Sequence, residues 1–279
     1  MNPDQQSERA VGGMETQVWC WPDAAPPHSG TDTVAREEPL EIRVRGQSVA
    51  VTMRTPGHDE ELAAGFLYTE GLIRNRDDVT GISFCRQGEA TDHANTLNVF
   101  LNATVEFDLE RLTRHFYASS SCGLCGKASI DSIHQLFPPI QSHSQISPGT
   151  LLALPDRLRA AQPVFDATGG LHAAGLFDLD GNPICVREDV GRHNAVDKVV
   201  GAGFLGNTLP YEDRILVVSG RASFEIVQKA LAARIPIIAA LSAPSSLAVE
   251  AANDSGQTLI GFLRDKSFQV YSHPNRVSA

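Results

Sequence analysis

The chain has 279 residues, a formal net charge of −10, and 42% hydrophobic and 20% charged residues. This is the composition of a globular protein, which excludes a fully disordered chain, a collagen-like fibre and a coiled coil. The excess of acidic residues argues against a broad nucleic-acid-binding surface, because such a surface needs excess cations to displace counterions from the phosphates.

The predicted elements begin after a tail. Residues 1–36 are rich in Pro, Gly, Ser, Asp and Gln and show no apolar period, which is typical of a mobile N-terminal tail. Apolar residues then alternate over 40–44 and 49–53, which predicts a β-hairpin. Helical spacing of apolar residues predicts a helix over 59–68. Two further strands are predicted, at 79–84 and 97–101.

The middle of the chain is predicted to be mainly helical. Helices are expected over 109–116, 127–136 and 151–161. The segment 119–126 is too small and polar to belong to a core, so it is predicted to be a loop that leads into the second of these helices.

From residue 165 onward, strands alternate with helices. A hairpin is predicted over 173–178 and 183–187, around the turn Asp180-Gly181-Asn182. Wholly apolar strands are predicted at 215–218 and 235–240. The other expected elements are helices over 192–200 and 223–233, a helix that follows residues 242–246 and ends at 252, and strands over 258–263 and 268–271. Continuous apolar strands that alternate with helices predict an α/β fold in which a parallel or mixed sheet is covered on both faces.

Composition and pattern together predict three regions. They are a tail over 1–36, a smaller N-terminal α/β subdomain over 37–118, and a larger α/β domain over 119–279 that begins with the loop at 119–126.

The five cysteines are Cys20, Cys85, Cys122, Cys125 and Cys185. An odd number in a chain of this length does not describe a disulfide framework. The N-terminus lacks a basic start and an apolar stretch, and no apolar run approaches the ~18 residues needed to cross a bilayer. We therefore expect a cytoplasmic protein with reduced thiols and no membrane partner.

Cys122-Gly123-Leu124-Cys125 is the strongest local motif. Two thiols at this spacing can share a metal, cycle through a disulfide, or supply a nucleophilic thiolate. The nearby Lys127 and a helix N-terminus would both stabilise a thiolate. A plain pair of small loop residues is the structural alternative.

A metal interpretation needs more ligands than two cysteines. His58-Asp59-Glu60 supplies the His-x-Glu that zinc deaminases combine with Pro-Cys-x-x-Cys, but Ser121 stands where that signature has proline. His58 and Glu60 are equally explained as residues of the first turn of a helix. A zinc-dependent deaminase-like hydrolase remains an alternative.

Polar segments follow the predicted strands of the C-terminal half. Ser219-Gly220-Arg221-Ala222-Ser223 and Ser242–Ser246 each join an apolar strand to a helix, and Arg187–Asn194 gathers charged and amide groups around Gly191. Two such junctions on successive strands would face one crevice, which favours a nucleotide-like ligand. Simple capped turns, with Ser223 as an N-cap, are the alternative.

Four segments of the sequence resemble the FdhD family, the formate dehydrogenase accessory sulfurtransferases. They are Thr55–Gly71, Ser121–Lys127, Glu188–Lys198 and Ser219–Ser223, in the order in which that family has them. The resemblance extends from about residue 38 to the C-terminus.

The resemblance implies a fold related to the cytidine deaminases, with no structural metal. It also implies a sulfur carrier that accepts sulfur from a cysteine desulfurase as a persulfide on Cys122. The sulfur would pass to the bis(molybdopterin guanine dinucleotide) molybdenum cofactor before this cofactor enters formate dehydrogenase. Cys125 would resolve or stabilise the persulfide, and a homodimer is expected. A non-catalytic chaperone for the cofactor is a further alternative.

The resemblance also implies a cofactor-binding stretch. It comprises Phe262, Leu263, Arg264, Asp265, Lys266 and Ser267. The strand-to-helix junctions add Ser219, Gly220, Arg221, Ser223, Asp189, Gly191 and His193 as candidate cofactor contacts.

Overall fold

The computed structural model describes residues 11–23, 25–85, 94–107, 134 and 136–278. Its strands are β1 (Gly13–Cys20), β2 (His28–Ala35), β3 (Glu38–Val44), β4 (Gln47–Arg54), β5 (Val79–Phe84), β6 (Thr96–Leu101), β7 (His172–Phe177), β8 (Pro183–Asp189), β9 (Ile215–Val218), β10 (Ile237–Ala240), β11 (Thr258–Arg264) and β12 (Ser267–Ser272). Its helices are α2 (Asp59–Thr69), α6 (Pro148–Ala160), α7 (Pro163–Thr168), α8 (Arg192–Leu205), α9 (Phe224–Ala232) and α10 (Ser246–Asp254), with short 3-10 turns η1 (Arg76–Asp78) and η2 (Pro274–Arg276). The strands form sheets of two, four and six strands.

The six-stranded sheet is mixed and has the order β12-β11-β10-β9-β7-β8. β9, β10 and β11 run parallel to one another. β7 is antiparallel to both β9 and β8, so β8 runs in the same direction as β9. The carboxyl ends of β8, β9, β10 and β11 therefore lie at one edge of the sheet, and the loops that follow these strands emerge there.

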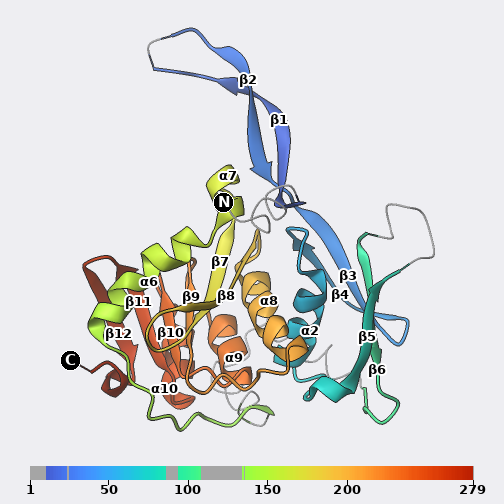
Figure 1. Ribbon diagram of the computed structural model, residues 1–279, viewed down its shortest axis with the longest axis vertical. Helices are drawn as coiled ribbons and strands as arrows, with labels where there is room; N and C mark the ends of the chain where they lie inside the picture. Colours follow the sequence, from blue (N-terminus) through green and yellow to red (C-terminus); the bar gives the residue numbers. More distant parts are fainter. Residues whose placement is uncertain (1–10, 24, 86–93, 108–133, 135, 279) are drawn as a thin grey trace.

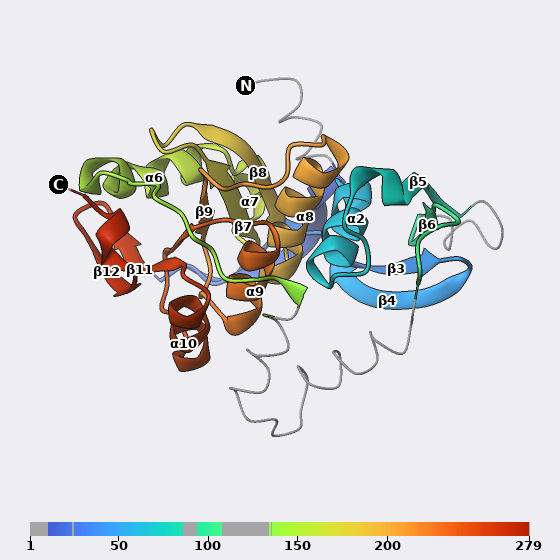
Figure 2. The same cartoon turned by 90° about the horizontal axis from the view of Figure 1, so that it is seen from below.

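Helices cover both faces of this sheet, as Figures 1 and 2 show. α6 buries Leu151, Leu154 and Leu158 against one face, whereas α8, α9 and α10 pack on the other. Because both faces are covered, every residue of β9 and β10 is buried. This explains why these strands have continuous apolar runs instead of alternation.

The four-stranded sheet has the order β4-β3-β6-β5 and is covered by α2. Its core includes Leu40, Ile42 and Leu97 of the sheet and Leu62 and Leu67 of the helix. α2 lies beside α8 in both views, so these two helices form the layer between the two larger sheets (Figures 1 and 2).

Most predicted elements of the described residues are confirmed. They are the β3–β4 hairpin, α2, β5, β6, α6, the β7–β8 hairpin and the succession from α8 to β12. The expected α/β fold with a mixed sheet covered on both faces is also present. The short helix α7, which begins with Pro163, was not predicted. The predicted loop at 119–126 and the helix at 109–116 lie outside the described residues, as does most of the helix at 127–136.

The prediction that residues 1–36 form a tail without regular structure is wrong for the part that contains β1 and β2. β1 and β2 form a complete antiparallel hairpin from Gly13 to Ala35, which Figure 1 shows extending away from the rest of the chain. Threonine, serine and glycine occupy many of its positions, so its strands carry little apolar alternation. Their cross-strand backbone hydrogen bonds are invisible to a pattern based on hydrophobicity.

Among the described residues, no helix combines the length and the apolar character that crossing a membrane requires.

Candidate functional site

The loops after β9, β10 and β11 meet at the carboxyl edge of the six-stranded sheet. A β-bridge joins Ala222 to Pro244, and the amide of Ser245 donates to the carbonyl of Ala222 at 3.0 Å. The amide of Phe262 donates to the carbonyl of Ser242 at 3.1 Å. The two strand-to-helix junctions that the sequence pointed to therefore lie side by side, as expected for a crevice at this edge.

A cluster of cationic side chains lies beside the loop after β9. A Cβ atom on Gly220 would lie only 3.3 Å from Nδ1 of His172, so a larger residue would press against this ring. Burial lowers the pKa of His172 below its usual value, and the nearby charges of Arg192, His193 and Arg221 lower it further. Arg192 and Arg221 thus bring positive charge to this edge, whereas His172 is held towards its neutral form.

Arg192 adds a second indication of a ligand at this edge. Its buried Nε atom has no hydrogen-bond partner among the described residues. A buried donor without a partner destabilises the folded state. An anion bound at this edge would supply the acceptor that the Nε of Arg192 lacks among the described residues. We call His172, Arg192, His193 and Arg221 the cationic corner.

Ser223 occupies the N-cap position of α9, but its side chain does not cap the helix. Its hydroxyl lies instead 3.1 Å from Nε2 of His193, which also contacts Glu225 Oε2 at 2.9 Å. By contrast, Ser245 caps α10 through the amide of Ala248 at 3.2 Å. The N-terminus of α9 therefore lacks the side-chain cap that α10 has, which leaves its amides suited to an anion.

The contacts of His193 also limit its chemistry. The hydrogen bond from His193 holds the pKa of Glu225 below its usual value. Both partners of His193 meet the same ring nitrogen, whereas a hydrolase triad places its nucleophile and its carboxylate on different nitrogens. The arrangement orients the imidazole at the edge of the cationic corner and does not form a serine hydrolase centre.

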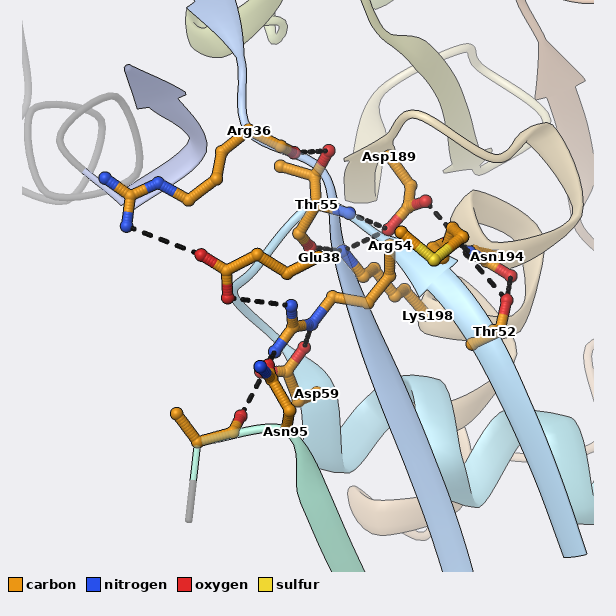
Figure 3. Close-up of polar contacts among 12 residues, drawn as sticks. Arg36, Glu38, Thr52, Arg54, Thr55, Asp59, Asn95, Asp189, Asn194 and Lys198 are labelled. Atoms are coloured by element: carbon orange, nitrogen blue, oxygen red, sulfur yellow. Dashed lines mark hydrogen bonds and ion pairs between the residues drawn. The ribbon is translucent and has the colours of Figure 1, made fainter. Parts of the chain in front are cut away.

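Asp189, the last residue of β8, is fully buried, and both of its carboxylate oxygens accept hydrogen bonds from neighbouring groups (Figure 3). Its Oδ2 lies 2.7 Å from Nζ of Lys198 and accepts from the amide of Thr55 at 3.2 Å. Its Oδ1 accepts from the amide of Gly191 at 2.8 Å and from Asn194 at 3.0 Å. Asp189 thus shapes the turn that leads into α8 and the cationic corner.

Arg54 organises the neighbouring start of α2 and is also drawn in Figure 3. It is 1% exposed, and its Nε donates to Asp59 Oδ1 at 2.8 Å. Its other nitrogens donate to Glu38 at 3.3 Å, and to the side chain of Asn95 and the carbonyl of Ala94 at 3.2 Å. This network fixes α2 against β3 and the start of β6.

The His-x-Glu segment is engaged in an ion-pair network. His58 has a left-handed backbone conformation, with φ of 58°, and its Nδ1 lies 3.5 Å from Glu61. Glu61 also accepts two hydrogen bonds from Arg187, at 2.5 and 2.8 Å. Burial works to raise the pKa of Glu61, but the hydrogen bonds from Arg187 prevail and hold it at about 2.

The described residues contain no group of three or more His, Cys, Asp or Glu side chains placed to hold a metal ion. Cys122 and Cys125, which the deaminase interpretation would add to His58, lie outside the described residues.

A cavity of about 230 Å³ opens between the start of α2, α7 and β8. Its walls are largely apolar and include Val11, Val164 and Leu171, with Lys198 and His58 among its polar groups. Lys198 lines this cavity and also forms an ion pair with Asp189, so the cavity adjoins the turn that leads into the cationic corner.

The predicted cofactor-binding stretch at 262–267 spans the end of β11 and its turn into β12. Phe262 is 40% exposed and has φ of 51°, whereas Leu263 points into the core. The guanidinium of Arg264 donates to the carbonyl of Leu241, in the loop after β10. The remaining positions, Asp265, Lys266 and Ser267, are exposed.

The structure brings this stretch to the same sheet edge as Ser219, Gly220, Arg221, Ser223, Gly191 and His193. Two members of the cationic corner were not among the predicted site residues. Arg192 lies within the polar segment 187–194 that the sequence pointed to, but His172 gives no signal in the sequence, because its partners come from loops far along the chain.

Comparisons with known proteins identify close relatives. The model of the FdhD/NarQ family matches residues 35–278. A protein of Mycolicibacterium paratuberculosis named sulfur carrier protein FdhD is 53% identical over 252 residues, which cover 88% of this chain and 92% of that protein. A protein of Sulfolobus acidocaldarius with the same name is 47% identical over 249 residues, which cover 89% of this chain and 92% of that protein.

A solved structure shares the fold. The crystal structure of a putative formate dehydrogenase accessory protein from Desulfotalea psychrophila superimposes with a TM-score of 0.75 at 24% identity, covering 96% of this chain and 100% of that one.

Proposed function

Because this chain belongs to the FdhD/NarQ family, we propose that it is a sulfur carrier that activates formate dehydrogenase. In this proposal Cys122 accepts sulfur from a cysteine desulfurase as a persulfide. The sulfur then passes to the bis(molybdopterin guanine dinucleotide) molybdenum cofactor, which is the substrate, before the cofactor enters formate dehydrogenase. The relatives' names support the general role of a sulfur carrier.

The observation that carries the proposal is the cationic corner. The cofactor ends in guanine nucleotides whose phosphates need cations and free amides. Arg192 and Arg221 supply guanidinium groups, and the N-terminus of α9 supplies amides that Ser223 does not cap. Gly220 lets the His172 ring and the Arg192 side chain pack beside this loop. We assign the phosphates to this corner, with 262–267 beside them.

The first transfer is a displacement at sulfur. The Cys122 thiolate attacks the outer sulfur of the desulfurase persulfide, so that a new S–S bond forms on Cys122 and the bond within the donor breaks. The donor cysteine leaves as a thiolate with the electron pair of the broken bond. Cys125 either resolves this persulfide or stabilises it.

In the second transfer, the S–S bond on Cys122 breaks and Cys122 departs as a thiolate. The two electrons that convert the sulfane sulfur into sulfide come from the reduced metal of the cofactor. Binding the guanine ends at the cationic corner would hold the metal near Cys122, so that this step becomes effectively unimolecular.

Three accompanying features complete the proposal. The fold is related to that of cytidine deaminases, the chain acts as a homodimer, and it works in the cytoplasm with the desulfurase and formate dehydrogenase as partners. These follow from the family resemblance.

The first transfer is tested by loading the purified chain with a cysteine desulfurase and cysteine and weighing its peptides. We expect a gain of one sulfur atom on the Cys122 peptide. Cys122→Ala should abolish it, and Cys20→Ala, which removes a thiol from the β1–β2 hairpin, should leave it unchanged. An unmodified Cys122 peptide in the loaded wild type would contradict the proposal.

A second measurement separates the carrier from a chaperone that only binds the cofactor. In a strain that lacks this gene, Cys122→Ala should fail to restore formate dehydrogenase activity although the purified variant still binds GDP. If Cys122→Ala restores activity fully, the chain is a binding protein and not a sulfur carrier.

A further inference from the structure

The β1–β2 hairpin, residues 11–23 and 25–35, extends from the body of the chain as a separate two-stranded sheet, which we call the arm (Figure 1). Its strands pair without a bulge from Gly13 opposite Ala35 to Cys20 opposite His28. At its base, the amide of Arg36 donates to the carbonyl of Gly12 at 2.8 Å. The model of the family begins at residue 35, where the arm ends.

An arm of this kind is an incomplete sheet. A two-stranded hairpin is marginally stable alone in water, and a free strand edge is a template for pairing with another chain. Within the described residues, no third strand pairs with β1 or β2. The helix α7 packs against the base of the arm. The outer part of β1 therefore presents backbone donors and acceptors to a partner.

The arm also exposes the only two tryptophans of the chain. Trp19 is 68% exposed and Trp21 is 76% exposed, and their ring centroids lie 6.4 Å apart at a tilt of 52°. Such a separation is typical of paired aromatic rings, so the two form one apolar patch. Tryptophan is enriched among the residues that dominate binding at protein interfaces.

One face of the arm combines this patch with negative charge. Alternation along β1 places Glu15, Gln17 and Trp19 on the same face. The side chain of Gln17 donates to Thr31 across the strands at 3.3 Å, which confirms the register on this face. A carboxylate and an exposed indole on one strand face match two arginines of a facing strand, because one guanidinium pairs with the carboxylate and another stacks on the indole.

The charge of the arm decides between possible partners. Residues 11–35 contain Glu15, Asp23 and Asp32 and no Lys or Arg. An acidic arm repels nucleic acid and anionic lipid surfaces. Pairing with the equally acidic arm of a second copy of this chain is also disfavoured. The charge complements a basic polypeptide.

We propose that the arm docks an extended, arginine-rich segment of another protein. The segment pairs with the free edge of β1 as a third strand, and its arginines lie against Trp19 and Glu15. This is strand addition, in which the backbone supplies affinity and alternate side chains supply selectivity. The proposal does not depend on sulfur transfer.

The place of the arm makes such docking useful. The carbonyl of Arg36, at the base of β2, accepts from the hydroxyl of Thr55 at 2.9 Å, and the amide of Thr55 donates to Asp189 (Figure 3). Asp189 shapes the turn into the cationic corner. The base of the arm therefore adjoins the turn into the cationic corner, so a protein held by the arm would be tethered at this end of the molecule.

The two tryptophans make the test direct, because all tryptophan fluorescence of the full chain comes from the arm. The probe is an eight-residue peptide of alternating Arg and Val, with a Glu and Val peptide as its counterpart. We expect a saturable shift of the emission to shorter wavelength with the basic peptide alone. The affinity should fall roughly tenfold as NaCl rises from about 0.05 to about 0.5 M.

Three outcomes would overturn the proposal. The first is no saturable change with the basic peptide, and the second is an equal change with the acidic one. The third is an emission shift that depends on protein concentration without any peptide, which would mean that the arm instead covers a second copy of this chain.

Variants refine the test. Trp19→Ala, with Trp21 left as the reporter, should weaken peptide binding tenfold or more, and Glu15→Gln several-fold. Glu250→Gln, which removes an exposed carboxylate on α10, is the matched control and should change nothing. Circular dichroism should show the same thermal unfolding for all three variants. Wild-type affinity in Trp19→Ala would refute the assignment of the binding face.

Discussion

Gly65 of α2 and Gly201 of α8 pack against each other so closely that neither position has room for a side chain. A Cβ atom on Gly65 would lie 1.8 Å from the carbonyl oxygen of Asp197 and 2.8 Å from the amide nitrogen of Gly201. A Cβ atom on Gly201 would lie 1.8 Å from the carbonyl oxygen of Glu61. Because α2 covers the four-stranded sheet and α8 covers the six-stranded one, this contact sets the distance between the two sheets.

Gly65→Ala and Gly201→Ala should each destabilise the chain by about 3 kcal/mol, because the added methyl group forces the two helices apart. Gly149→Ala is the control, since a Cβ atom there would meet Ser147 at an ordinary 3.8 Å. Urea unfolding provides the measurement. Equal stabilities for Gly65→Ala and Gly149→Ala would show that the helices can separate at little cost.

Removal of one partner from the buried ion pair of Asp189 and Lys198 should destabilise the chain more than removal of both. Lys198→Met leaves a buried carboxylate without its cation and should cost about 3–5 kcal/mol. Adding Asp189→Asn should recover part of this loss. The control is Asp166→Asn, at a surface pair with Arg159 whose side chains are 44% and 49% exposed, which should cost under about 1 kcal/mol. The double variant would contradict this account if it were less stable than Lys198→Met alone.

Arg221→Ala should weaken the binding of GDP about tenfold, because one charge-assisted hydrogen bond contributes ~1.5–3 kcal/mol. Arg214→Ala is the matched control, since Arg214 precedes β9 at the opposite edge of the sheet. Isothermal titration calorimetry measures both affinities. Equal losses in the two variants would mean that GDP responds to the overall charge and not to the cationic corner.

Binding at the cationic corner should also depend on pH through His172. The pKa of His172 is lowered in the free protein, and a bound phosphate would raise it, so binding takes up a proton. GDP affinity of the wild type relative to His172→Gln should therefore increase as the pH falls from about 7.5 to about 5.5. Taking the ratio cancels the protonation of the nucleotide itself. A ratio that does not change with pH would remove His172 from the site.

The ion pair of Glu61 and Arg187 should contribute to acid stability. The pKa of Glu61 is lowered from 4.5 to about 2, so the stabilisation is complete above pH 4.5 and is lost as the pH falls towards 2. Glu61→Gln should reduce the free energy of unfolding at pH 7 by ~1–3 kcal/mol and flatten its decline in acid. Glu60→Gln, at an exposed neighbouring position, is the control. Parallel acid profiles of wild type and Glu61→Gln would contradict the assignment.

Much of the larger sheet could be predicted from local pattern. Continuous apolar residues at 215–218 predicted a strand buried on both faces, and the structure confirms one there. The polar segment 219–223 directly after it predicted a junction at the sheet edge, and this is also found. Such predictions succeed because a strand that is buried on both faces consists of apolar residues only. The first polar residues after it then indicate where the strand ends.

The partners of each element were decided by the tertiary structure alone. His172 reaches Gly220 because β7 inserts antiparallel between β9 and β8, an arrangement that no single segment encodes. Hydrophobic periodicity reports which face of a segment is buried, but not which distant segment buries it. The sequence by itself thus determined the kinds of element, the family resemblance and the chemistry of its motifs. Only the folded chain determined the cationic corner, the contact of Gly65 with Gly201 and the projecting arm, because each depends on contacts between residues far apart along the chain.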